Sequence, residues 1–138
     1  MTTAPKFDTV MVIDDNNIDL YVTARTMTKN NFCNNLLQYS SAADAIKYLK
    51  SNVENATAWP QVILVDIYMP VMSGFEFMEA FDKLPETLRK NTLVYIVSST
   101  IDEHDIARAL NDENVVDFQE KPLSSEFLEK INPVEVAK

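Results

Sequence analysis

Short apolar runs alternate along the chain with stretches in which apolar residues recur every three or four positions. The runs are rich in β-branched and aromatic residues, and several are apolar at consecutive positions, as in strands buried on both faces of a parallel sheet. They lie at Val10–Ile13, Val62–Val65, Leu93–Val97 and Val115–Phe118, with a weaker candidate at Asn35–Tyr39. Apolar stripes at helical spacing predict helices over about 17–30, 41–54 and 75–84, around Ile106–Leu110 and around Phe127–Ile131.

This alternation predicts an α/β fold. Strand–helix units in succession favour an open parallel sheet with right-handed crossovers and helices on both faces. No internal repeat and no Pro/Gly/Ser-rich linker divides the chain, so we expect one domain over 1–138, with a core over about 8–131 and tails at 1–6 and 133–138. The only glycine, Gly74, precedes the third predicted helix, where we expect unusual backbone angles that glycine adopts freely.

The composition excludes several classes of protein. Twelve Lys+Arg against 21 Asp+Glu give a formal charge of −9, which disfavours nucleic acid as a partner because that binding requires phosphate neutralisation. No apolar run approaches the roughly 18 residues of a membrane span, and the start of the chain lacks a signal peptide's apolar region, so we expect a cytoplasmic protein. A lone cysteine, Cys33, excludes an internal disulfide and a cysteine-cluster zinc site. A single glycine cannot build the loop of a P-loop NTPase.

Charged and hydroxyl side chains stand where the predicted strands end. These residues are Asp14 and Asp15 after the first strand, Asp66 after the third, Ser98 at the end of the fourth and Lys121 just past the fifth. In open parallel sheets the carboxyl ends of the strands form the ligand site. Three carboxylates brought close together repel one another, and the usual remedy is a hard divalent cation such as Mg²⁺. Lys121 adds a positive charge able to reach a carboxylate or a phosphoryl oxygen.

These segments resemble the receiver domain of two-component response regulators, the CheY-like family. The matching segments are VMVIDDNNIDL at 10–20, VILVDIYMPVMSGFEFM at 62–78, VYIVSST at 94–100 and DFQEKP at 117–122. Order and spacing agree with the family from about Asp8 to Ile131, and the stretch from Asp66 to Gly74 is especially specific. The resemblance implies a flavodoxin-like, doubly wound (βα)5 fold with a five-stranded parallel sheet in the order 2-1-3-4-5.

The resemblance also implies a magnesium-dependent phosphorylation site. Asp66 matches the aspartate that accepts the phosphoryl group and is also a metal ligand. Asp15 would bind Mg²⁺ (or Mn²⁺) directly, and Asp14 would act largely through a metal-bound water. The backbone carbonyl of Tyr68 matches the remaining protein ligand, and the bulky Tyr68 side chain departs from the family's commoner small or polar residues.

Three further residues match the family's activation machinery. Ser98 would donate a hydrogen bond to the phosphoryl group, and Phe118 matches the aromatic switch position that fills the space vacated when Ser98 moves. Lys121 would form a charge pair at the site, and its bond to Pro122 is expected to be cis. The surface made by the fourth helix, fifth strand and fifth helix would then change shape.

The implied function is that of a receiver that takes a phosphoryl group from a sensor histidine kinase or a histidine phosphotransfer protein and signals to an unknown downstream protein. It would turn over no separate substrate. Only five residues follow Pro133, which favours a stand-alone receiver. Two alternatives are a receiver-like interaction module that is never phosphorylated, and a hydrolase with an aspartyl nucleophile. The hydrolase is disfavoured because its second aspartate is replaced by Tyr68.

Overall fold

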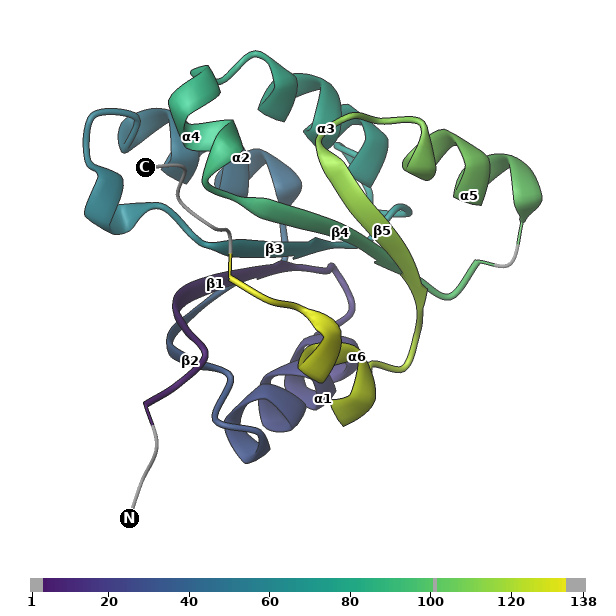
Figure 1. The fold of residues 1–138 in the computed structure, drawn as a ribbon. Helices are drawn as coiled ribbons and strands as arrows, with labels where there is room; N and C mark the ends of the chain where they lie inside the picture. The colour runs from purple at the N-terminus through teal and green to yellow at the C-terminus, as the bar shows by residue number, and fades with distance from the viewer. Residues whose placement is uncertain (1–3, 101, 134–138) are drawn as a thin grey trace.

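The computed structural model describes residues 4–100 and 102–133, which form a five-stranded parallel sheet between two layers of helices (Figure 1). The strands are β1 (Phe7–Ile13), β2 (Cys33–Tyr39), β3 (Val62–Val65), β4 (Leu93–Ser98) and β5 (Val115–Glu120). All neighbouring strands pair in parallel, in the order β2-β1-β3-β4-β5. This confirms the predicted fold class and strand order. β1 and β2 begin earlier than predicted because Phe7 pairs with Cys33.

The helices divide between the two faces of the sheet. They are α1 (Asn17–Lys29), α2 (Ala42–Ser51), α3 (Gly74–Asp82), α4 (Glu86–Lys90), α5 (Glu103–Leu110) and α6 (Ser125–Lys130), with a 3-10 turn, η1, at Ala56–Ala58. Helices α1 and α6 cover one face, and α2, α3 and α5 cover the other (Figure 1). The short α4 and η1 lie in segments for which the apolar pattern predicts no element. Among the described residues, no helix has the length and apolar character needed to cross a bilayer.

The central strand β3 explains why its sequence is apolar at every position. Val62 and Leu64 pack in the cluster beneath α1 and α6, whereas Ile63 and Val65 pack in the cluster beneath α2, α3 and α5. None of the four is more than 1% exposed. Burial of each such side chain stabilises the fold by about 1.5–3 kcal/mol, so β3 fixes the sheet from which the site residues project.

Gly74 does not have the unusual backbone angles that the sequence led us to expect. It has no positive φ, and the left-handed residue of this loop is Val71, at φ 69°. Glycine is required at the start of α3 for a steric reason instead: a Cβ on Gly74 would lie 2.2 Å from the backbone oxygen of Asp66. The Gly74 N–H donates to the carbonyl of Ile67 at 2.7 Å, so α3 begins in direct contact with the loop that carries Asp66.

Candidate functional site

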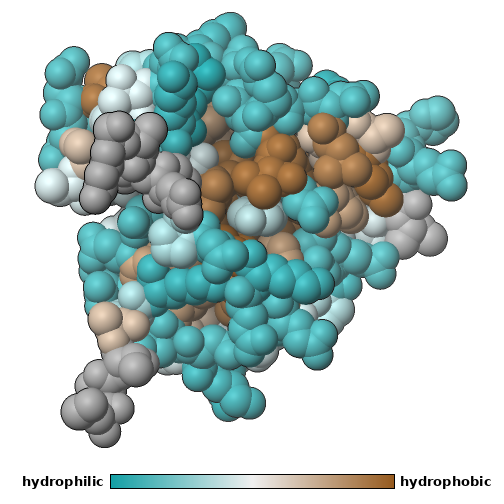
Figure 2. Space-filling model, in the orientation of Figure 1, coloured by the Kyte–Doolittle hydropathy of each residue, from teal (hydrophilic) through white to brown (hydrophobic). Residues whose placement is uncertain are grey.

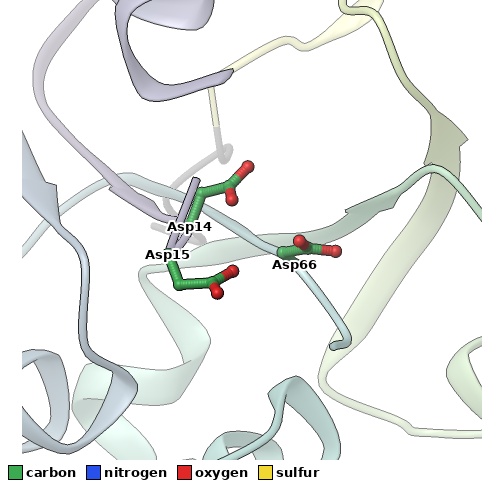
Figure 3. Close-up of side chains that lie close together, drawn as sticks. All are labelled: Asp14, Asp15 and Asp66. Carbon is green, nitrogen blue, oxygen red and sulfur yellow. The ribbon is translucent and has the colours of Figure 1, made fainter. Parts of the chain in front are cut away.

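Three carboxylates meet at the carboxyl edge of the sheet. Asp14, Asp15 and Asp66 each place an oxygen within 4.8 Å of the others, and their side chains extend to the same side of the sheet edge (Figure 3). The register of the two central strands brings them together, because Ile13 pairs with Val65 and the N–H of Asp66 donates to the carbonyl of Ile13 at 3.0 Å. An all-oxygen set of donors of this kind suits a hard divalent cation such as Mg²⁺.

Backbone N–H groups orient two of these carboxylates. Asp14 Oδ1 accepts from the N–H of Asn16 at 2.9 Å, and Asp66 Oδ1 accepts from the N–H of Ile67 at 2.8 Å. Asp14 is 4% exposed and Asp66 is 8% exposed, whereas Asp15 lies open to solvent. Burial raises the pKa of Asp14, and it outweighs the hydrogen bonds from Lys121 and Asn16 that lower it. The metal-free site therefore holds a carboxylate that loses its proton less readily than usual.

The ammonium group of Lys121 sits among carboxylates. Its Nζ donates to Asp14 Oδ2 at 2.5 Å, to Asp19 Oδ2 at 2.9 Å and to Asp66 Oδ2 at 3.2 Å. Burial by itself lowers the pKa of Lys121, but the hydrogen bonds to Asp14 and Asp19 and the charge of Asp66 raise it above its ordinary value. Lys121 is therefore fully charged at neutral pH. Its peptide bond to Pro122 is cis, which confirms that expectation.

Asp19 is a site residue that the sequence analysis missed. It is the third residue of α1, and this helix starts three residues after Asp14, at Asn17. Asp19 lies in the first turn of the helix that directly follows Asp14 and Asp15, so its place at the start of this helix was the signal available. The side chain of Asn16 caps α1 by accepting from the N–H groups of Ile18 and Asp19, which fixes this first turn.

Ser98 and Phe118 take different positions relative to the carboxylates. Ser98 ends β4, is 1% exposed, and its backbone carbonyl accepts from the N–H of Lys121 at 3.0 Å, which ties the ends of β4 and β5 together. Its hydroxyl accepts from the N–H of Thr100 at 3.4 Å. Phe118 lies within β5, half-buried against the cluster on the α2, α3 and α5 face, and pairs with Ile96. Ser98 thus belongs to the site edge, and Phe118 lies beside it in the sheet.

Tyr68 connects the loop after β3 to the start of α5. Its hydroxyl donates to the carboxylate of Asp105, which also accepts from Thr100 Oγ1 at 3.3 Å. The hydrogen bond to Asp105 is the main reason that the pKa of Tyr68 lies above its ordinary value. The Tyr68 ring is 61% exposed, so it lies at the surface and not within the core. No pattern in the sequence predicted this contact.

The architecture agrees with comparisons to known proteins. The family model for the response regulator receiver domain matches residues 10–132. This chain therefore belongs to the response regulator receiver domain family, the CheY-like proteins of two-component systems. Receiver domains are signalling modules without turnover of a separate substrate, and they bind Mg²⁺ at an acidic pocket.

Two solved structures of response regulators share the fold, and a further protein is similar in sequence. A two component response regulator from Cytophaga hutchinsonii is 27% identical, with a TM-score of 0.82 over 90% of this chain and 92% of that chain. A response regulator receiver protein from Dyadobacter fermentans is 30% identical, with a TM-score of 0.79 over 88% of this chain and 92% of that chain. A protein named probable methanogenesis regulatory protein FilR2, from Methanothrix harundinacea, is 26% identical over 88% of this chain and 76% of its own length.

Proposed function

We propose that this receiver takes a phosphoryl group on Asp66 from the phosphohistidine of a sensor histidine kinase or a histidine phosphotransfer protein. The observation that carries the proposal is the meeting of Asp14, Asp15 and Asp66 within 4.8 Å, with Lys121 Nζ 3.2 Å from Asp66 Oδ2. A protein that only bound partners would have no physical need to hold these like charges together at a partly buried edge.

The carboxylates fit a bound Mg²⁺ or Mn²⁺. In the proposed arrangement Asp15 and Asp66 bind the metal directly, Asp14 binds largely through a water, and the backbone carbonyl of Tyr68 completes the protein ligands. The raised pKa of Asp14 supports a metal, since a divalent cation favours the ionised form that burial disfavours. When bound, the metal supplies positive charge that offsets the phosphoryl oxygens.

The residues of the chain position the transfer. A carboxylate oxygen of Asp66 forms the new bond to phosphorus as the bond from phosphorus to the histidine nitrogen of the donor breaks. The Ile67 N–H holds Asp66 Oδ1, which limits rotation of the carboxylate during attack. Lys121 supplies a fixed positive charge beside Asp66, and phosphoryl transfer depends mainly on such positioning and charge neutralisation.

The phosphorylated state would alter one surface of the molecule. The hydroxyl of Ser98 is free to rotate away from the Thr100 N–H and donate to a phosphoryl oxygen, which draws the loop after β4 inward and lets Phe118 turn into the space. The surface affected is made by α5, β5 and α6. Figure 2 shows an apolar patch over α5 and β5, where Leu110 and Val116 are each 50% exposed. Phosphorylation would shift the population between two packings of this surface, which a downstream protein would read.

Acetyl phosphate with Mg²⁺ tests the proposal. We expect the intact mass of the protein to rise by one phosphoryl group, and we expect no rise in Asp66→Asn or when the metal is chelated. An unchanged mass for the wild-type chain, or an equal gain in Asp66→Asn, would refute Asp66 as the acceptor. An added phosphomonoester should remain unhydrolysed, which separates this function from that of a hydrolase.

A further inference from the structure

Lys121 donates hydrogen bonds to three carboxylates, and one of the three lies outside the group of carboxylates that could hold a metal ion. An ammonium group has three N–H donors, and the three partners of Lys121 are Asp14, Asp19 and Asp66. Asp14 and Asp66 belong to the group of carboxylates able to hold a metal ion, and Asp19 does not. The carboxylate of Asp19 is therefore available to the lysine without competition from the cation.

This separation matters because the other two partners change during the reaction. A cation at the site competes with Lys121 for the oxygens of Asp14 and Asp66, and phosphorylation converts the carboxylate of Asp66 into an acyl phosphate. Of the three partners, only Asp19 is neither phosphorylated nor part of the group of carboxylates that could hold the cation. The 2.9 Å contact with Asp19 is thus the lysine contact for which neither the cation nor the phosphoryl group competes directly.

Asp19 is also held rigidly enough to direct the lysine. Its N–H donates to the side chain of the cap residue Asn16 at 3.1 Å, and the next residue, Leu20, is buried against the sheet. The Asp19 side chain is 39% exposed and that of Lys121 is 15% exposed, so the contact is shielded on the lysine side. Asp19 and Lys121 line the same surface cavity, together with Ser99 and the cis-linked Pro122.

We propose that Asp19 is a positioning residue for phosphoryl transfer, which holds the Lys121 ammonium group within reach of the phosphoryl oxygens while Asp14 and Asp66 are engaged elsewhere. This inference rests on the proposed function, since it assigns the regulation of the same lysine. Without Asp19, the flexible lysine stem samples more orientations, and fewer of them place Nζ beside the reacting group.

The chain offers a matched control at Asp44. Asp44 is the third residue of α2, as Asp19 is of α1, and its N–H donates to the side chain of the cap residue Ser41. Asp44 is exposed, and its carboxylate has no ion pair among those found in the described residues. Asp44→Ala therefore removes the same negative charge from the same position of a helix without touching Lys121.

The experiment measures the initial rate of phosphorylation by acetyl phosphate at saturating Mg²⁺, followed by intact mass. It uses the wild type, Asp19→Ala, Asp44→Ala, Lys121→Ala and the double variant Asp19→Ala/Lys121→Ala. We expect Asp19→Ala to lower the rate roughly tenfold and Asp44→Ala to change it less than about twofold. In the Lys121→Ala background, the Asp19 substitution should change the rate less than about twofold, because Asp19 acts through the lysine.

Each other outcome is decisive. A rate for Asp19→Ala within about twofold of that for Asp44→Ala overturns the inference but leaves Asp66 as the acceptor. An undiminished loss in the Lys121→Ala background also overturns it, since the effect would then be structural or electrostatic and not lysine positioning. Failure of the wild type to gain phosphate overturns the proposed function itself. A Mg²⁺ affinity for Asp19→Ala similar to that for Asp44→Ala shows that the metal group is intact.

Discussion

Substitution of the only glycine tests how tightly α3 fixes the acceptor loop. In Gly74→Ala the new Cβ would lie 2.2 Å from the backbone oxygen of Asp66 and 2.9 Å from both the Asp66 carbonyl carbon and Ile67 Cα. All three atoms belong to the backbone, so no side-chain rotation relieves the overlap. Ordinary contact begins near 3.4 Å, and the start of α3 and the Asp66 loop must therefore separate by about 1 Å.

The cost follows from the contacts that this separation disturbs. Overpacking of a close-packed interior costs about 1–3 kcal/mol, and a stretched hydrogen bond from Gly74 to Ile67 adds about 1 kcal/mol. The better helix propensity of alanine returns up to about 1 kcal/mol. We expect a net loss of about 2 kcal/mol in the free energy of unfolding. A 1 Å displacement of Asp66 should also slow phosphorylation by up to about 100-fold.

Urea unfolding and acetyl phosphate labelling measure the two effects in the same samples. Asn17→Ala serves as the control because Asn17, like Gly74, is the first residue of its helix, and it is exposed. The control should change the free energy of unfolding by less than about 0.5 kcal/mol. A Gly74→Ala protein as stable as the control, with an unchanged labelling rate, would show that the close approach of α3 to Asp66 does not constrain the site.

Two further predictions concern the side chain of Tyr68 and the contribution of Asp14 to stability in the absence of a metal. Tyr68→Ala should lose phosphate about threefold to tenfold faster than the wild type, because we expect the tyrosine ring to shield the acyl phosphate from water. Tyr68→Phe keeps the ring and loses only the hydrogen bond to Asp105, so its rate should fall between the two. Equal or slower decay in Tyr68→Ala, followed by intact mass, would contradict this. Because burial raises the pKa of Asp14, its contribution to metal-free stability is favourable below the ordinary aspartate pKa and is lost as pH rises through the raised value. Metal-free Asp14→Asn should therefore have a free energy of unfolding about 1 kcal/mol greater than that of the wild type at pH 7, with the difference closing toward pH 4. Mg²⁺ at about 100 times its Kd for the wild type should stabilise the wild type by about 2.7 kcal/mol and Asp14→Asn by less.

The sequence was sufficient for the sheet and for the carboxylates because both depend on local pattern. Four consecutive apolar residues in β3 indicate burial on two faces, and parallel strands in the predicted order bring their carboxyl ends to one edge. Asp14, Asp15 and Asp66 follow directly from that geometry. Family resemblance added the roles of these residues, which apolar periodicity does not contain.

Features that depend on the approach of distant segments were not predictable in the same way. Gly74 illustrates the limit: the sequence led us to expect unusual backbone angles, whereas the structure shows that the close backbone of Asp66 is the reason for a glycine. The bond from Tyr68 to Asp105 joins residues 37 positions apart, with no repeating pattern between them. The short α4 has too few residues to show helical periodicity and is held by burial of Leu88.

In the proposed function, the charges of the site link metal binding to the change of shape. Among the described residues of the site, the carboxylates of Asp14, Asp15, Asp19 and Asp66 and the ammonium group of Lys121 sum to a formal charge of −3. Replacement of the Asp66 carboxylate by an acyl phosphate adds about one more negative charge, so transfer without a divalent cation would be opposed at a partly buried edge. Even with a cation, the new oxygens require hydrogen-bond donors. Lys121, which Asp19 holds in place, is one such donor, and in the proposed function the hydroxyl of Ser98 becomes another as it leaves the Thr100 N–H and the loop after β4 moves. The electrostatic demand that makes the metal necessary thus also makes movement of that loop the expected response to phosphorylation.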